Sequence, residues 1–290
     1  MDGYSATGAE PDLNTRFIPG SETMVQNSRM FDFLRYDFGY SWPLTRGHLL
    51  VFLAFASFAA LCYWRGWSRW ATTFMAVIAA WGLSGALIMH YVIRINVPMT
   101  MPTPAFLALG RGNVVDLGAG SGRATVMVLQ SRPGTTVTGL DRYTGYYGID
   151  DNTPERLRAN ARIGGVEDRL RVQVGDMRQL PFSDAEFDGA LSIAAMDHLR
   201  RDDIPLAIAE TARVLKPGGE FLFVTINSDF WVHLMMPLAI HGHGGYWDWR
   251  ANETLWRQRF DDGGFDVVET GTRPAELYLL AKKRALAAAR

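Results

Sequence analysis

Two stretches in the first third of the chain are apolar on every helical face and contain no Asp, Glu, Lys or Arg. They cover Leu49–Trp64 and Ala71–Ile93. A helix rises about 1.5 Å per residue, so the second stretch can cross a bilayer, and the first can do so once it is extended back to Leu44. The pattern predicts a transmembrane helical hairpin over 44–95, with a tight loop at Arg65–Arg69.

The residues at the expected helix ends and contacts fit a membrane. Aromatic belts place tryptophans at the two membrane surfaces, and four lie near the expected ends: Trp42, Trp64, Trp67 and Trp70. Small residues four apart would let the two helices approach closely: Ala56 with Ala60, and Gly82 with Ala86. The alternative is a pair of core helices inside a soluble cap, which needs a larger shell than the remaining amino-terminal residues supply.

Positive charge on either side of the hairpin predicts its orientation. The loop carries Arg65 and Arg69, whereas the outer flanks carry more arginines: Arg29, Arg35, Arg46, Arg94 and Arg111. Positive flanks favour the cytoplasmic side, so we expect both ends of this two-span membrane protein, and the domain that follows, in the cytoplasm. No basic segment followed by an apolar run occurs at Met1, so we expect no cleaved signal peptide.

The pattern divides the chain into five parts. They are an amino-terminal tail (1–43), the hairpin (44–95), a proline-rich linker (96–110), a globular domain (111–284) and a short tail (285–290). Within the first part, Met30–Phe38 mixes rings with charges. That segment would lie along the membrane interface or pack on the domain as a lid, and the sequence leaves both open.

The domain shows short apolar runs separated by helix-compatible segments. The expected strands are 114–117, 136–140, 169–174, 187–192, 220–225, 265–270 and 277–281. In the first strand a short apolar run ends in Asp116, and glycines then recur at every second position, at Gly118, Gly120 and Gly122. A dinucleotide fingerprint would have its third glycine one residue later, where Arg123 stands.

These motifs resemble those of class I S-adenosylmethionine-dependent methyltransferases. The acid-x-G-x-G-x-G loop is followed in the family order by four further segments: Asp141 after the second strand, Gly175–Phe182, Phe187–Ser192 and Arg213–Gly219. The resemblance implies a Rossmann-like, doubly wound α/β sheet, mostly parallel with an antiparallel last strand. It also implies a transferase that uses S-adenosylmethionine and releases S-adenosylhomocysteine.

The resemblance also assigns the cofactor pocket. Asp116 and the three glycines would hold the methionine part and the close turn, Asp141 would take the ribose hydroxyls, and Asp176 with Met177 would border the adenine. The full set of expected cofactor residues is Asp116, Gly118, Gly120, Gly122, Asp141, Arg142, Asp176, Met177 and Ser192.

The acceptor side has weaker signals. His198 is a candidate base, because the unperturbed pKa of imidazole suits that task, and Asp197 stands beside it. Rings after the second strand and an aromatic, Met-rich segment over 230–249 would contact or cover a lipophilic acceptor: Tyr146, Tyr147, Trp231, His241 and His243. Ordinary packing is the alternative for each.

Composition excludes several other classes. A net charge of −1 argues against a nucleic-acid partner, and the single cysteine, Cys62, cannot form an internal disulfide or a metal cluster. We expect no metal, and the sequence does not indicate an oligomeric state.

The function we expect is methyl transfer to a lipophilic small molecule or lipid by a membrane-anchored enzyme on the cytoplasmic face. Two alternatives stay open. One is a soluble methyltransferase with a helical cap that acts on small metabolites. The other is a non-catalytic subunit that binds S-adenosylmethionine and serves in assembly.

Overall fold

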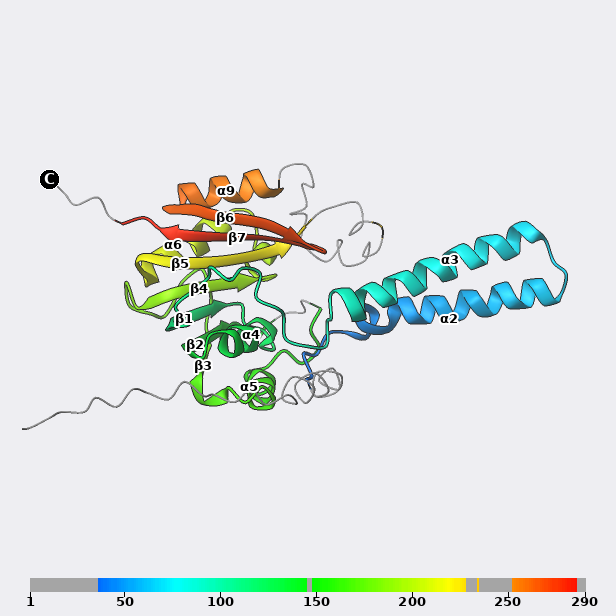
Figure 1. Cartoon of the computed structure of the whole chain (residues 1–290), viewed down its shortest axis with the longest axis horizontal. Helices are drawn as coiled ribbons and strands as arrows, with labels where there is room; N and C mark the ends of the chain where they lie inside the picture. Colours follow the sequence, from blue (N-terminus) through cyan, green and yellow to red (C-terminus); the bar gives the residue numbers. More distant parts are fainter. Residues whose placement is uncertain (1–35, 145–147, 228–233, 235–251, 286–290) are drawn as a thin grey trace, which may run out of the picture. The chain divides into compact units, whose positions relative to one another are not determined.

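Both predicted apolar helices are present. The computed structural model describes residues 36–144, 148–227, 234 and 252–285. Helix α2 (Trp42–Trp64) and helix α3 (Arg69–Leu87) lie side by side, and α3 continues into one π-helical turn, η2 (Ile88–Val92) (Figure 1). The turn between them is tight, since the backbone N–H of Trp67 donates to the carbonyl of Cys62 over 2.9 Å.

The two helices touch through glycine. A Cβ added to Gly82 would lie 2.7 Å from the backbone nitrogen of Phe52, and one added to Gly85 would overlap the ring of His48. Gly82 therefore lies at the contact as predicted, whereas Ala60 is exposed. Small residues here let the backbones approach closely, which is how helices pair in an apolar solvent.

A seven-stranded sheet forms the centre of the domain. Its order is β3-β2-β1-β4-β5-β7-β6, with β7 antiparallel to both neighbours and β1 to β5 parallel. This confirms the predicted doubly wound sheet with an antiparallel last strand. The strands are β1 (Arg111–Leu117), β2 (Gly134–Asp141), β3 (Leu170–Val174), β4 (Phe187–Ile193), β5 (Leu215–Ile226), β6 (Phe265–Arg273) and β7 (Glu276–Lys283).

Alternate strand residues fill two separate cores. In β1, Val115 and Leu117 pack into the cluster that contains α6 and α9, whereas Val114 packs into the cluster that contains α4 and α5. Successive side chains of a strand point to opposite faces, so one apolar strand supplies both cores. The covering helices are α4 (Arg123–Ser131), α5 (Pro154–Ile163), α6 (Ile204–Val214) and α9 (Asn252–Asp262), with the short 3₁₀ turns η3 (Glu167–Arg169) and η4 (Met196–His198) (Figure 1).

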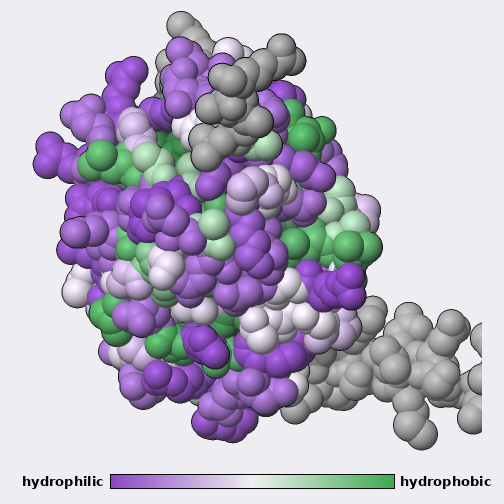
Figure 2. Space-filling view, turned by 90° about the vertical axis from the view of Figure 1, so that its left-hand side faces the viewer, coloured by the Kyte–Doolittle hydropathy of each residue, from purple (hydrophilic) through white to green (hydrophobic). Residues whose placement is uncertain are grey.

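The surface of the domain contrasts with that of the hairpin. The face shown in Figure 2 is mostly hydrophilic, with hydrophobic residues in small separate patches. On the hairpin, large apolar side chains are exposed instead: Trp64 by 77%, Trp70 by 86% and Phe74 by 61%.

The segment expected to be a stiff linker packs against the domain. Phe106 is fully buried in the core on the α4 side, and the N–H of Leu107 donates to Glu220 over 2.6 Å. The hydroxyl of Thr103 donates to Glu269 over 2.8 Å. Two apolar residues after the prolines give this segment a place in the core. The boundaries set at residues 43, 95, 110 and 284 stay predictions.

Residues 36–41 also pack on the domain. Asp37 and the side-chain amide of Asn160 exchange hydrogen bonds of 3.0 and 2.8 Å, and Phe38 is 3% exposed. Tyr40 forms an antiparallel bridge with Ile149. Residues 36–41 therefore contact the domain, while residues 1–35 are outside the described part of the chain, so the choice between a lid and an interfacial segment stays open.

Candidate active site

The expected cofactor residues meet at one edge of the sheet. Gly118 follows β1, Asp141 ends β2, Asp176 follows β3, and η4 follows β4 closely. These four strands are parallel and adjacent, so their carboxyl ends lie at the same edge. In doubly wound sheets the ligand site lies at this edge, where the strand order reverses between β1 and β4.

The loop between β1 and α4 requires its glycines. Gly118, Gly120 and Gly122 have φ values of 83°, 52° and 92°, in the left-handed region. A Cβ on Gly118 would overlap that of Ala195, and a Cβ on Gly122 would overlap Leu157. Only glycine combines this conformation with this close packing, so positions 118 and 122 accept no side chain.

Asp141 is held in place by backbone donors. Its Oδ2 accepts from the N–H of Gly120 over 2.9 Å, and its Oδ1 accepts from the N–H of Tyr143 over 2.7 Å and from the Asn152 amide over 3.5 Å. A carboxylate has about four acceptor sites, so capacity remains for ribose hydroxyls. Beside it, Oδ1 of Asn152 and Oη of Tyr143 are buried without a hydrogen-bond partner among the described residues.

Asp116 lies beneath the glycine loop. It is 1% exposed, and its Oδ2 accepts from the hydroxyl of Thr125 over 2.5 Å. Burial raises the pKa of Asp116 to about 7, the Thr125 hydrogen bond opposes that rise, and the nearby charge of Asp141 adds to it. Two carboxyls that repel one another favour a positively charged ligand group at this edge, such as an ammonium or a sulfonium.

Asp176 and Met177 border the same edge. The hydrogen bonds of Arg178 to Asp176 lower the pKa of that carboxyl, and Arg142 lies 3.8 Å from it. The methyl carbon of Met177 lies 3.2 Å from where a Cβ of Gly118 would stand. Met177 therefore packs over the glycine loop, where the adenine is expected.

The end of β4 carries the expected acceptor-side groups. Ser192 is fully buried, donates to the carbonyl of Leu117 over 3.1 Å and accepts from the N–H of Met196 over 3.1 Å, so it fixes the turn. Asp197 accepts from Thr225 over 2.7 Å, while its Oδ1 is buried without a partner among the described residues. His198 lies half-buried on η4. The roles of Ser192, Asp197 and His198 stay predictions.

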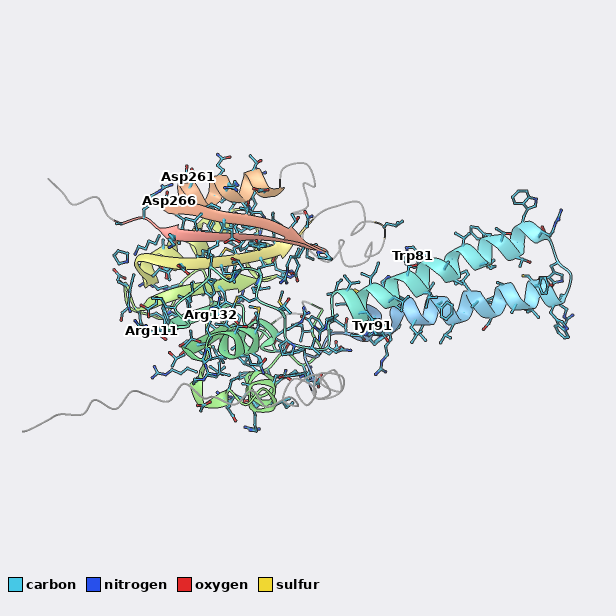
Figure 3. All side chains as sticks on the ribbon, viewed as in Figure 1. Trp81, Tyr91, Arg111, Arg132, Asp261 and Asp266 are labelled. Carbon is cyan, nitrogen blue, oxygen red and sulfur yellow. The ribbon has the colours of Figure 1, made fainter. Side chains whose placement is uncertain are left out.

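Five expected acceptor residues lie outside the described residues: Tyr146, Tyr147, Trp231, His241 and His243. Within the expected cover, the structure describes Leu234. Its carbonyl accepts a 2.8 Å hydrogen bond from the indole N–H of Trp81 on α3 (Figure 3). This contact joins the cover to the hairpin.

Arg123 has a role that the sequence analysis did not foresee. From the first position of α4 it donates to the carbonyls of Ile93, Arg94 and Val97, over 2.8, 3.2 and 2.9 Å. These carbonyls belong to residues that directly follow η2, so Arg123 connects the end of the hairpin to the glycine loop between β1 and α4. The sequence marked Arg123 only as the residue that replaces a glycine, because its partners lie 26 to 30 positions away.

Comparison with known proteins identifies the family. A family model described as "Methyltransferase domain" matches residues 114–219. An uncharacterized methyltransferase of Synechocystis is 33% identical over 174 residues, which cover 56% of this chain and 71% of that protein. The chain belongs to the class I S-adenosylmethionine-dependent methyltransferases. Membership implies S-adenosylmethionine as the methyl donor of this methyltransferase.

Two further relatives are similar to this chain over shorter stretches. A 24-methylenesterol C-methyltransferase of rice is 35% identical over 38% of this chain and 27% of its own length. A ubiquinone/menaquinone biosynthesis C-methyltransferase of Paracoccus denitrificans is 32% identical over 40% of this chain and 42% of its own length. The methyltransferase thus spans less than half the length of these two relatives.

The residues present fit S-adenosylmethionine. Asp141 offers acceptor sites, Asn152 and Tyr143 bring buried polar atoms that lack partners among the described residues, and the glycine loop brings its backbone close. The described residues of the methyltransferase contain no group of three His, Cys, Asp or Glu side chains that would hold a metal ion.

Proposed function

We propose that this methyltransferase is anchored in a membrane and transfers a methyl group to a lipophilic small-molecule or lipid acceptor at the cytoplasmic face. One observation carries the proposal. The chain combines the methyltransferase domain with two helices that are long and apolar enough to span a bilayer. The most apolar 18-residue stretches of these helices are only 6% and 22% buried.

The low burial favours a membrane over a soluble cap. Core helices of a soluble protein are mostly buried, whereas α2 and α3 leave Trp70, Phe74 and Tyr63 exposed by 86%, 61% and 82% within the described structure. Apolar surface in water carries a penalty of about 25 cal/mol per Å². A bilayer removes that penalty for both helices.

Two contacts support an acceptor that arrives from the membrane. Arg123 connects the residues after η2 to the glycine loop, and Trp81 connects the hairpin to Leu234 of the expected cover. The names of the sterol and quinone relatives describe enzymes of lipophilic compounds, which supports the same acceptor class here.

The chain's residues bind and orient the reactants. When bound, S-adenosylmethionine supplies an electrophilic methyl group. The glycine loop and Asp141 hold the cofactor at the edge of the sheet, and burial of the acceptor excludes water. His198, on η4 after β4, is the candidate that takes a proton from the acceptor. Holding two reactants in line supplies most of the remaining catalysis.

Methyl transfer to separated cell extracts tests the acceptor class. The purified full chain is incubated with methyl-labelled S-adenosylmethionine and either a membrane lipid extract or a soluble metabolite extract. We expect label in the organic phase of the lipid reaction, and roughly tenfold less or lower for Asp141→Ala at limiting S-adenosylmethionine. Label only in soluble metabolites would contradict the acceptor class, and no label with either extract would favour a non-catalytic subunit.

Thiol labelling tests the topology. Single cysteines are placed at Ser68 or Ser183 in a Cys62→Ala background, and intact cells are treated with an impermeant thiol reagent. We expect labelling at position 68 and none at 183 before lysis. Labelling at 183 would contradict the orientation, and recovery of the protein in a carbonate wash would contradict the membrane hairpin itself.

A further inference from the structure

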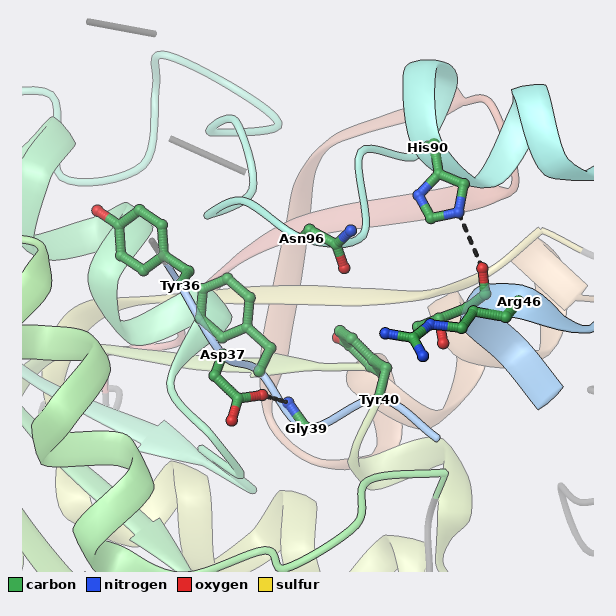
Figure 4. Close-up of a pocket in the computed structure, with 9 residues that line it drawn as sticks. Tyr36, Asp37, Gly39, Tyr40, Arg46, His90 and Asn96 are labelled. Atoms are coloured by element: carbon green, nitrogen blue, oxygen red, sulfur yellow. Dashed lines mark hydrogen bonds between the residues drawn. The ribbon is translucent and has the colours of Figure 1, made fainter. Parts of the chain in front are cut away.

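A cavity of about 210 Å³ lies where the hairpin meets residues 36–40 (Figure 4). Its walls come from three places: the first turns of α2, the end of η2 with the residues after it, and the segment that packs on the domain. The lining residues are Tyr36, Asp37, Phe38, Gly39, Tyr40, Thr45, Arg46, His90 and Asn96.

The cavity contains hydrogen-bond donors that have no partner among the described residues. The side chains of Arg46, Tyr40 and Asn96 point toward one another across it (Figure 4). None of the three makes a side-chain hydrogen bond or ion pair within the described part of the chain. A guanidinium, an amide and a phenol offer several N–H and O–H groups to one oxygen-rich ligand.

Two other polar side chains of the wall, His90 and Asp37, have partners. Nε2 of His90 lies 2.8 Å from the carbonyl of Thr45, which can only accept, so this nitrogen carries the proton. Oδ1 of Asp37 accepts from the N–H of Gly39 over 2.9 Å, and Oδ2 lies 3.6 Å from Arg156. The negative charge on the wall is therefore paired, whereas the positive charge of Arg46 is not.

This balance selects an anion with several oxygens. Guanidinium groups pair well with phosphate because their N–H donors match two phosphate oxygens at once. Arg46 lies in the first turns of α2, close to Trp42, which is 59% exposed. In a helix that spans a bilayer, these turns lie at the level of the lipid headgroups.

We infer that the cavity binds the phosphate of an anionic phospholipid headgroup, with Arg46 as the paired cation and Asn96 and Tyr40 as further donors. The inference uses the membrane placement of the hairpin from the proposed function, and it does not depend on methyl transfer. It assigns the base of the hairpin a lipid site distinct from the cofactor edge.

Titration of the full chain in detergent tests this site. Short-chain phosphatidylglycerol is added below its micelle concentration, and heat of binding is measured for the wild type, Arg46→Gln and Arg69→Gln. Arg69 is the control, because it is also an exposed arginine in the first turn of a hairpin helix, but it does not line the cavity. We expect Arg46→Gln to weaken binding roughly tenfold or more and Arg69→Gln to leave it within about twofold.

Two further measurements separate the possible sources of the phosphate. Inorganic phosphate should compete with the short-chain lipid, and a matched diacylglycerol without phosphate should not bind. Arg46-dependent binding of inorganic phosphate without lipid binding would overturn the lipid source. Equal lipid binding by the wild type and Arg46→Gln would overturn the site, provided that both bind S-adenosylmethionine equally, which shows that the variant is folded. A failure of methyl transfer would leave these titrations unchanged, so the two proposals fail separately.

Discussion

The hairpin and the sheet domain bury opposite kinds of residue. In the domain, the largest side chains are the most buried, and Phe187, Phe221 and Phe260 have no exposed surface. In the hairpin the buried residues include Gly82 and Gly85, while many large side chains, such as Trp70 and Phe74, are exposed. One chain thus contains two opposite packing rules.

The difference shows what each region is built to contact. Water drives large apolar groups inward, so the domain has aromatic cores on both faces of its sheet. Lipid gives no such drive, and helices in lipid associate through small residues that allow close backbone contact. The contrast therefore supports a watery setting for the domain and an apolar one for the hairpin. It also predicts that changes in one region, away from the contacts of Arg123 and Trp81, leave the other intact.

The largest expected effect concerns chemistry within the domain. If His198 takes the acceptor proton, His198→Ala lowers turnover by about 100-fold, the scale of a lost general base. Affinity for S-adenosylmethionine and retention in the membrane stay unchanged. Turnover with the organic-phase acceptor and binding calorimetry measure the two. A mild loss of rate would make His198 structural and leave orientation as the main source of catalysis.

A second change in the domain separates cofactor binding from anchoring. Asp141→Ala removes the acceptor held by Gly120 and Tyr143, and should weaken S-adenosylmethionine binding by roughly 1.5–3 kcal/mol, the scale of a lost charged hydrogen-bond acceptor. Nicotinamide dinucleotides should bind neither protein. Calorimetry with each ligand measures both effects. Affinity equal to that of the wild type would refute the ribose assignment.

The glycines of the hairpin allow a matched pair. Gly82→Ala places a Cβ 2.7 Å from the Phe52 nitrogen and 2.9 Å from the His48 carbonyl oxygen, so the helices must separate. We expect a loss of about 1–3 kcal/mol in hairpin stability, as for overpacking. Gly47→Ala, which meets nothing within 4 Å, is the control.

Unfolding of the hairpin variants is followed by helical signal during titration with sodium dodecyl sulfate, with S-adenosylmethionine affinity measured alongside. Equal stability of Gly82→Ala and Gly47→Ala would mean that α2 and α3 do not pack as described. Loss of cofactor affinity in Gly82→Ala alone would show that the two regions are coupled.

The last prediction concerns the pH dependence that the buried carboxyl of Asp116 adds to stability. Burial raises its pKa from 3.8 to about 7, so between these values the folded protein keeps a proton that the unfolded chain releases. Stability therefore falls as the pH rises through this window. Asp116→Asn should flatten the fall of the urea midpoint from about pH 4 to 7. The exposed Asp202→Asn serves as the control, and equal slopes in all three proteins would contradict the buried carboxyl.

Local patterns predicted the features that local chemistry determines. The glycine loop and Asp141 follow from short motifs, and the places of the strands follow from apolar runs bounded by turns, although β5 begins five residues earlier than predicted. The partners of Arg123 could not be predicted from short motifs, because they depend on how the residues after η2 pack against the start of α4. Phe106 and Leu107 gave a usable sign, since two apolar residues after a proline-rich run suggest burial rather than a free linker.

Arg123 also determines where the protein can be shortened. A shortened protein that starts after Val97 would lack every carbonyl that the Arg123 guanidinium binds. Its N–H groups would then lose these hydrogen bonds next to the glycine loop. A start after Leu107 would also take Phe106 out of the core. A shortened protein should therefore begin at or just before Ile93, so that it loses the hairpin and keeps the carbonyls that Arg123 binds next to the glycine loop.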